Sequence, residues 1–191
     1  RRSSDLENYD YVKRRAERRL REVESLGKPL DIKFTAVDGR QVDLTKTKGK
    51  VELVYFCASW CPPCVKEYVG IKAVYDKYHD QGFEVVGISL DQNEEQFKRY
   101  TEAKKIPWQQ HFEGNGFTNS IAMAQRIRVI PTLWLVDRNG NLVDRSARGS
   151  LEEKVKKLLP GIDESRNNHR KPQPKKRMTR DPTCGFPSAA V

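Results

Sequence analysis

An apolar, β-favouring run leads directly into two cysteines that are separated by two prolines. Residues 51–57 read Val-Glu-Leu-Val-Tyr-Phe-Cys, and Trp60-Cys61-Pro62-Pro63-Cys64 follows after two residues. The run predicts a buried strand, and proline is favoured in the first turn of a helix because its missing amide hydrogen would have no intrahelical partner there. We therefore expect the cysteines to lie where a strand ends and a helix over residues 62–79 begins.

Cysteines at such a position are suited to reversible disulfide chemistry. Two cysteines three positions apart close a small ring that is readily made and broken, whereas structural disulfides usually connect distant segments. The partial positive charge at a helix N-terminus favours the thiolate of Cys61, so its pKa is expected below the value of about 8.5 for free cysteine. Because Pro62 and Pro63 carry no amide hydrogen, the Cys64 amide is the nearest donor to the Cys61 sulfur. We therefore expect the Cys61 thiolate to be stabilised moderately rather than extremely, and the protein to be closer to a disulfide reductant than to a strong oxidant.

The pattern predicts a reaction in two steps. Cys61 attacks a substrate disulfide to form a mixed disulfide, and Cys64 then resolves it, which releases reduced substrate and leaves the Cys61–Cys64 bridge. The Cys64 thiol needs a proton acceptor, and Glu67 lies about one turn further along the same helix face. A partly desolvated Glu67 would have a raised pKa and accept this proton, whereas the alternative interpretation is a surface glutamate.

The sequence around the motif predicts an α/β domain. Residues 83–90 are continuously apolar, as central parallel strands are, so strand, helix and strand follow one another as a βαβ unit. The expected inner face of the helix consists of Val65, Tyr68, Val69, Val74 and Tyr78. The other expected elements are a helix over 4–26, a hairpin over 32–37 and 41–44, helices over 94–104 and 117–126, strands over 132–137 and 142–146, and a helix over 150–159.

Composition divides the chain into three parts. The net charge of +10 comes mostly from the two ends, and the segment after Gly161 has almost no apolar residues. We predict a basic amphipathic helix or linker over 1–26, a domain over 27–160 and a disordered basic tail over 161–191, because the tail buries too little apolar surface to offset the entropy of ordering it. The middle lacks the basic excess typical of nucleic-acid binding, and no apolar run approaches the ~20 residues of a membrane-spanning helix.

These motifs together resemble the thioredoxin-like thiol-disulfide oxidoreductases of the TlpA and ResA type, which are related to the AhpC/TSA proteins. The resemblance rests on residues 54–67, on 83–89 and on Ile130-Pro131-Thr132, and it covers roughly residues 27–160. It implies a thioredoxin fold, in which helices flank a central mixed β-sheet, extended by an N-terminal helix and a β-hairpin.

The resemblance also implies roles for individual residues. The reactive cysteines of the family match Cys61 and Cys64, its glutamate after the second cysteine matches Glu67, and its cis-proline facing the disulfide matches Pro131. The expected substrate contacts are Trp60, Pro62, Pro63, Ile130 and Pro131. Tyr55 stands where classical thioredoxins have a buried aspartate, which makes Glu67 more necessary as a proton acceptor.

Partners and location follow from the same resemblance. We expect a protein substrate that carries a disulfide or a dithiol, an upstream electron donor and no cofactor, in an antioxidant or redox-homeostasis role. The family is commonly extracytoplasmic, which suggests a periplasm-like site, and any membrane anchor would lie outside this chain. The residues do not predict an oligomeric state.

Two other functions stay open at this point. Cys57 and Cys61 have a CxxxC spacing that, with a histidine such as His111, would suit a copper metallochaperone, although a buried inert thiol also explains Cys57. Zinc is disfavoured because there is no second CxxC pair and the histidines are scattered, so we assign no metal ligand. The other alternative is a non-catalytic thioredoxin-fold binding module that attaches to an anionic partner through its basic ends. Cys184, in the tail, is either an incidental exposed thiol or a third exchanging cysteine.

Overall fold

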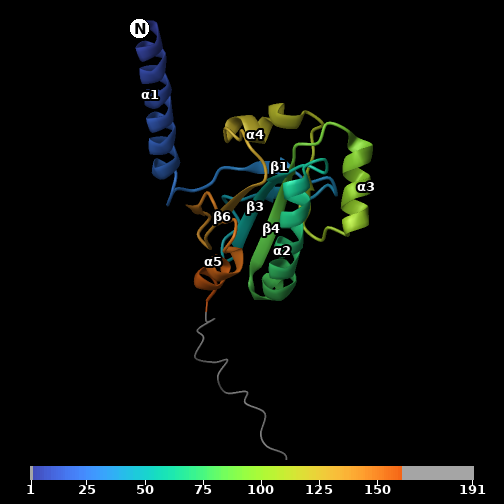
Figure 1. Ribbon diagram of the computed structural model, residues 1–191. Coiled ribbons are helices and arrows are strands. Elements are labelled where there is room, and N and C mark those ends of the chain that lie inside the picture. Colours follow the sequence, from blue (N-terminus) through green and yellow to red (C-terminus); the bar gives the residue numbers. More distant parts are fainter. Residues whose placement is uncertain (1, 161–191) are drawn as a thin grey trace, which may run out of the picture. The chain divides into compact units, whose positions relative to one another are not determined.

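A five-stranded mixed sheet forms the centre of the domain, with helices packed against it (Figure 1). The computed structural model describes residues 2–160, with side chains from residue 9 onward. The strands of this sheet are β3 (Val51–Cys57), β4 (Phe83–Ser89), β5 (Gln109–His111), β6 (Thr132–Val136) and β7 (Leu142–Asp144). Their spatial order is β5-β4-β3-β6-β7. β4 runs parallel to β3 and β5, whereas β6 runs antiparallel to β3 and β7. The predicted fold class is confirmed.

The helices differ in length and in how they join the sheet. They are α1 (Arg2–Glu24), α2 (Pro62–Tyr78), α3 (Glu94–Lys104), α4 (Ser120–Ala124) and α5 (Leu151–Leu158), with two 3-10 turns, η1 (His79–Gln81) and η2 (Gly116–Thr118). The carboxylate of Glu152 on α5 accepts hydrogen bonds from Tyr78 Oη at 2.9 Å and from Lys77 Nζ at 2.7 Å. This contact fastens the C-terminal end of α2 to α5.

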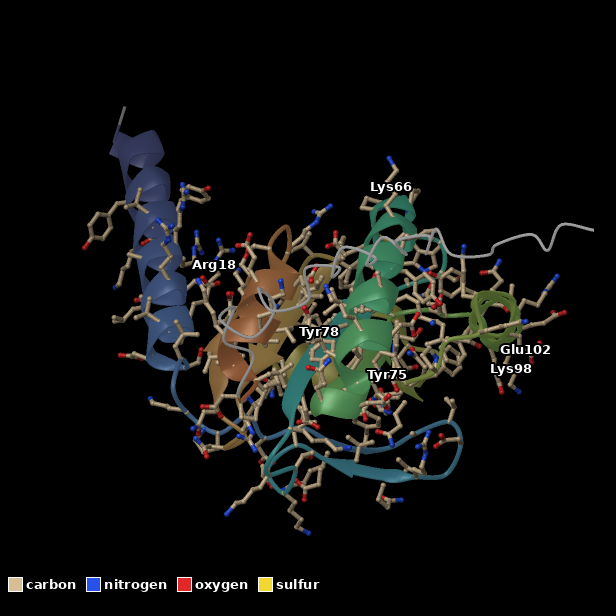
Figure 2. All side chains as sticks on the ribbon, turned by 90° about the horizontal axis from the view of Figure 1, so that it is seen from below. Arg18, Lys66, Tyr75, Tyr78, Lys98 and Glu102 are labelled. Carbon is tan, nitrogen blue, oxygen red and sulfur yellow. A yellow bond between two sulfur atoms is a disulfide. The ribbon has the colours of Figure 1, made fainter. Side chains whose placement is uncertain are left out.

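The buried face of α2 differs from the prediction at two positions. Figure 2 shows Tyr75 and Tyr78 on the side of α2 that faces the domain, whereas Lys66 points away. Val69 is 65% exposed and Val65 is only half-buried. The buried residues of α2 are Cys64, Tyr68, Ile71, Val74, Tyr75 and Tyr78. Their spacing of three and four positions starts from Cys64, and Val69 lies one position beyond this stripe, about 100° around the helix.

The segment between β4 and β6 contains two further differences. In place of one helix over 117–126, η2 is followed by the five-residue α4. The Asn119 side chain accepts a hydrogen bond of 3.1 Å from the Ala122 amide, so a new helix begins at this cap rather than continuing the turn before it. β5 was not predicted, and it pairs with the edge of β4, where Gly87 leaves room for the Gln110 side chain.

The N-terminal part of the chain is joined to the sheet at the end of α1. The Gly27 amide donates to the Leu142 carbonyl at 2.8 Å, the Leu142 amide donates to Lys28 at 2.9 Å, and Arg145 Nη1 donates to Ser25 Oγ at 2.9 Å. The predicted hairpin is present as β1 (Lys33–Thr35) and β2 (Gln41–Asp43), a separate antiparallel pair.

Two sequence predictions concern the whole chain. No helix within residues 2–160 is both long and apolar enough to cross a bilayer. The predicted disordered tail over 161–191, including Cys184, lies outside the described residues.

Candidate active site

The two cysteines of the motif lie at the start of α2 and form a disulfide. Their Cα atoms are 5.3 Å apart. Cys61 is the N-cap of α2, with φ −96° and ψ 103°, and Pro62 and Pro63 fill the first two helical positions. Both cysteines are buried, Cys61 with 5% of its surface exposed and Cys64 with 1%. The predicted position of the pair, between a buried strand and a helix that begins at prolines, is confirmed.

One backbone amide faces the sulfur of Cys61. The Cys64 amide donates to Cys61 Sγ at 3.3 Å, and the Val65 amide donates instead to the Cys61 carbonyl at 3.1 Å. Because the two prolines supply no amide hydrogen, the Cys64 amide is the single donor that the first turn of α2 aims at this sulfur. The predicted donor is therefore the observed one, and it stabilises negative charge on Cys61 when the disulfide is open.

Tyr55 connects the central strand to the second cysteine. Its side chain is buried, and its hydroxyl donates a hydrogen bond of 2.8 Å to the carbonyl oxygen of Cys64. Burial raises the pKa of the Tyr55 hydroxyl above its usual range. Tyr55 therefore keeps its proton and acts as a donor at this position, so it cannot accept a proton from Cys64.

Glu67 forms an ion pair that the sequence did not indicate. Its carboxylate accepts a hydrogen bond of 2.8 Å from Arg148 Nε, and the two side chains are 20% and 54% exposed respectively. Glu67 lies on α2 about one turn after Cys64, so this ion pair joins the first half of the helix to Arg148. Arg148 comes from the segment between β7 and α5, far from the motif in sequence, and nothing in its local pattern marks it.

A buried aspartate that the sequence analysis missed holds the loop in front of the cysteines. Asp91 is 2% exposed. Its Oδ1 accepts hydrogen bonds from the Ser59 amide at 3.0 Å and from Ser59 Oγ at 2.6 Å, and its Oδ2 accepts one from Ser89 Oγ at 2.7 Å. Asp91 follows β4, and Ser59 follows the neighbouring parallel strand. The sequence did contain a sign of this role, because Asp91 directly follows a predicted central strand. The loops after neighbouring parallel strands meet at the same end of the sheet, so Asp91 could have been expected near the cysteine motif.

Cys57 is a free thiol at the end of β3. Burial raises its pKa above the usual range, and the nearby charge of Asp91 raises it further. These effects disfavour the thiolate, which is the form that attacks disulfides and binds copper. His111 Nε2 lies 2.9 Å from a carboxylate oxygen of Glu113. Within residues 2–160, no three His, Cys, Asp or Glu side chains gather in a way that could hold a metal ion.

The expected substrate-contact residues come from two segments, the cysteine motif and the residues just before β6. Trp60 is 53% exposed and precedes Cys61, and the helix-starting prolines are also exposed. The Ile130–Pro131 bond is cis, as the resemblance implies. Thr132 pairs with Phe56, so Pro131 lies at the end of the sheet where β3 leads into the motif. The positions are thus known, and the roles of these side chains in binding remain predictions.

Comparison with known proteins gives consistent results. Residues 25–159 match the Redoxin family. The chain is 25% identical over 130 residues to the thiol-disulfide oxidoreductase ResA of Bacillus cereus, an alignment that covers 66% of this chain and 73% of that protein. It is also 34% identical over 111 residues to tryparedoxin of Trypanosoma brucei brucei, covering 56% of this chain and 76% of tryparedoxin.

Solved structures show the same relationship. The thioredoxin domain of a thiol-disulfide oxidoreductase from Bacteroides vulgatus superposes with a TM-score of 0.62 at 30% identity, covering 70% of this chain and 97% of that domain. A thiol:disulfide interchange protein from Bacteroides sp. gives a TM-score of 0.61 at 30% identity, covering 76% of this chain and 98% of that protein. The thioredoxin-like fold expected from the sequence is therefore confirmed.

Proposed function

Because the chain belongs to the Redoxin family and is a thiol-disulfide oxidoreductase of the ResA type, we propose that it reduces protein disulfides, with Cys61 as the nucleophile and Cys64 as the resolving thiol. The observation that carries the assignment is the hydrogen bond from the Cys64 amide to Cys61 Sγ at the N-cap of α2. This donor stabilises a thiolate on Cys61 and not on Cys64. The two sulfurs therefore differ in reactivity although both belong to one motif.

The proposed reaction balances as two successive exchanges. The Cys61 thiolate attacks one sulfur of the substrate disulfide, and the other substrate sulfur leaves as a thiolate that takes a proton. Cys64 then loses its proton and attacks Cys61 Sγ, so that the second substrate sulfur leaves. The substrate gains two electrons and two protons, and the Cys61–Cys64 disulfide is formed. An upstream dithiol donor returns the pair to the reduced state.

We assign the proton from Cys64 to Glu67. Glu67 is about one helical turn from Cys64, and only 20% of its side chain is exposed. Arg148 is a positioning residue in this proposal, because its ion pair with Glu67 orients the carboxylate. Tyr55 does not compete for the proton, since burial keeps its hydroxyl protonated.

The substrate contacts are proposed on exposure and position. Trp60, Pro62 and Pro63 offer exposed apolar surface on one side of the disulfide, and Ile130 and Pro131 lie at the same end of the sheet. An unfolded or extended segment around a substrate disulfide would pack on this surface. We further propose an extracytoplasmic location with a separate electron donor, which is supported by the resemblance to ResA.

Mass spectrometry and an insulin-reduction assay test this proposal. In graded glutathione buffers, the Cys61–Cys64 pair is expected to gain and lose two hydrogens, and Cys61→Ser is expected to abolish insulin reduction. Cys64→Ser is expected to accumulate a mixed disulfide with substrate, whose capture from a cell extract would identify the partner. Cys57→Ser is the matched control and is expected to keep turnover, because Cys57 is outside the exchanging pair. Unchanged turnover in Cys61→Ser would refute the assigned nucleophile.

A further inference from the structure

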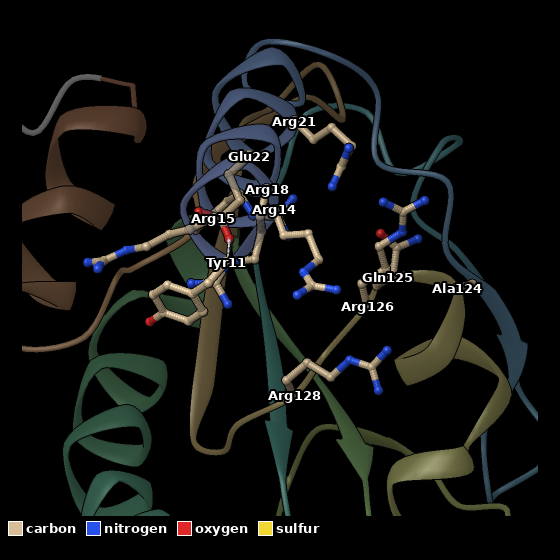
Figure 3. Close-up of a pocket in the computed structure, with 11 residues that line it drawn as sticks. Tyr11, Arg14, Arg15, Arg18, Arg21, Glu22, Ala124, Gln125, Arg126 and Arg128 are labelled. Atoms are coloured by element: carbon tan, nitrogen blue, oxygen red, sulfur yellow. Dashed lines mark ion pairs between the residues drawn. The ribbon is translucent and has the colours of Figure 1, made fainter. Parts of the chain in front are cut away.

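A groove lined by arginines lies between α1 and the segment that leads into the cis-proline loop. It has a volume of about 660 Å³, and seven arginines and one glutamate line it. Figure 3 shows the side chains of Arg18 and Arg21 from α1 and those of Arg126 and Arg128 from the opposite wall extending into the same space. We call this feature the arginine groove.

The positive charge of the arginine groove is poorly compensated. Arg18 lies 3.6 Å from Glu22, and Arg21 lies 3.9 Å from Glu17, both longer than the 2.7–2.9 Å of a strong charge-assisted hydrogen bond. Arg126 and Arg128 have no carboxylate within 4.0 Å among the residues that the structure describes. Like charges on both walls repel each other, so an anion in the groove would remove an unfavourable interaction as well as add favourable ones.

The arginine groove adjoins the proposed substrate surface. Arg128 precedes Val129, which is 67% exposed, and Val129 precedes the cis Ile130–Pro131 bond. On the α1 side, the wall is held to the domain by the hydrogen bonds of Ser25 and Gly27 to the β7 region. A protein chain that extends from the disulfide along the cis-proline loop would therefore pass the guanidinium group of Arg128.

We propose that the arginine groove binds an acidic segment of the same partner protein whose disulfide reacts with Cys61. This inference rests on the proposed function and names the charge of the substrate that the function requires. Each guanidinium group can form paired hydrogen bonds with one carboxylate. An extended chain rises about 3.3 Å per residue, so a short run of Asp or Glu presents carboxylates to both walls of the groove.

The geometry of α1 favours an acidic segment over a membrane surface. At 100° per residue, Arg14, Arg18 and Arg21 lie on one side of α1, and Val12, Leu20 and Val23 lie on the opposite side, where they are exposed. A bilayer would cover the apolar side. The arginines would still face the domain across the groove, out of contact with the bilayer. A narrow peptide segment can enter the groove, whereas a flat bilayer or a DNA duplex is too wide to do so.

Two fluorescent peptides test the proposal on the full chain. One peptide carries four glutamates and the other four glutamines, and both contain no cysteine, so binding is measured without turnover. At 50 mM salt, we expect the glutamate peptide to bind at least about fivefold more tightly, with this preference fading at 300 mM salt because exposed charges are then screened. Arg18→Gln combined with Arg128→Gln removes one arginine from each wall and is expected to abolish most of the preference.

Control measurements decide among the outcomes. Arg99→Gln removes an exposed arginine on α3 and is expected to keep the full preference. Equal binding of both peptides, or a preference that survives the double substitution, would overturn the proposal, as would binding to anionic vesicles without binding of the glutamate peptide. Insulin reduction is measured on the same preparations. If the parent protein prefers the glutamate peptide but does not reduce insulin, the proposed function alone is contradicted. If the parent protein reduces insulin but shows no preference for the glutamate peptide, this inference alone is contradicted.

Discussion

The hydroxyl of Tyr55 donates a hydrogen bond of 2.8 Å to the carbonyl oxygen of Cys64, which joins the middle of the central strand to the second cysteine of the disulfide. Classical thioredoxins have an acidic group at this position, and this chain has a donor whose proton is held by burial. The contact therefore supports the backbone of the disulfide loop and takes no part in proton transfer.

Removing the Tyr55 hydroxyl is expected to lower the stability of the fold and to change the redox midpoint of the disulfide. Tyr55→Phe removes the hydrogen bond from a buried hydroxyl to the Cys64 carbonyl, so the free energy of unfolding should fall by about 0.5–1.5 kcal/mol in urea denaturation. The redox midpoint in glutathione buffers should also shift. Tyr68→Phe is the matched control, because it removes a hydroxyl that bonds to the Lys104 carbonyl at 2.7 Å away from the disulfide. Equal shifts in both variants would argue against a local role for Tyr55.

The ion pair of Glu67 with Arg148 predicts a change in the pH dependence of turnover. Glu67→Gln removes the proposed proton acceptor, and the rate of mixed-disulfide resolution should fall by about 10²-fold near neutral pH, with a smaller deficit at high pH where solvent base takes over. Arg148→Gln should alter the same profile more weakly, because it removes the charged partner of Glu67 and leaves the carboxylate itself in place. Lys66→Gln serves as the control, since its side chain points away from the domain (Figure 2). A Glu67→Gln profile identical to that of the parent protein would remove Glu67 from the mechanism.

Asp91 is predicted to be a positioning residue for the loop before Cys61. Asp91→Asn replaces one acceptor oxygen by a donor, so at least one of the hydrogen bonds to Ser59 or Ser89 is lost in a buried site. The free energy of unfolding should fall by about 1–3 kcal/mol. The pH midpoint of the alkylation of reduced Cys61 by iodoacetamide should also shift. A purely structural role of Asp91 would leave this midpoint unchanged. Asp80→Asn, at an exposed position on η1, should change neither quantity.

Glu52 gives a separate prediction about stability and pH. Its side chain is 2% exposed, its Oε2 has no hydrogen-bond partner among the described residues, and burial raises its pKa from 4.5 to about 8. Between these two pH values the folded state holds a proton that the unfolded state releases. The free energy of unfolding should therefore decrease as pH rises from 4.5 to 8, by up to roughly 1.4 kcal/mol per pH unit.

Glu52→Gln is expected to remove this slope, because the amide does not titrate. Urea denaturation at pH 5, 6.5 and 8 measures it, and the variant should gain stability relative to the parent protein as pH rises. Glu153→Gln, at an exposed position on α5, should retain the parent slope. If the slopes of Glu52→Gln and the parent protein coincide, Glu52 is not the group responsible.

Sequence alone predicted the elements whose signals are local. The strand over 51–57, the helix start at Pro62 and the helix over 94–104 were predicted with the observed bounds, because buried runs and caps are encoded in adjacent residues. β5 is only three residues long and is stabilised by pairing with β4, so its own sequence contains too little pattern to detect. The predicted helix over 117–126 failed because Asn119 starts a new cap within it.

The site divides in the same way. The cysteine pair and the Cys64 amide follow from one continuous motif, and both were predicted. The partners of that motif come from distant segments: Asp91 lies 32 residues from Ser59, and Arg148 lies 81 residues from Glu67. Only the folded chain brings these side chains together. The buried face of α2 was open to prediction, because Ile71 and Tyr75 continue the spacing that starts from Cys64 and Val69 lies outside it.

The attachment of α2 to α5 through Glu152 limits how another protein can distinguish the oxidised form from the reduced form. The helix is anchored at the end opposite to its cysteines, so we expect its far half to stay in place when the sulfur bridge opens and closes. We expect rearrangement to be restricted to the opening turn and the loop beside it. A protein that discriminates between the two oxidation states would then have to contact that small area directly, since we expect the rest of the molecular surface to stay the same.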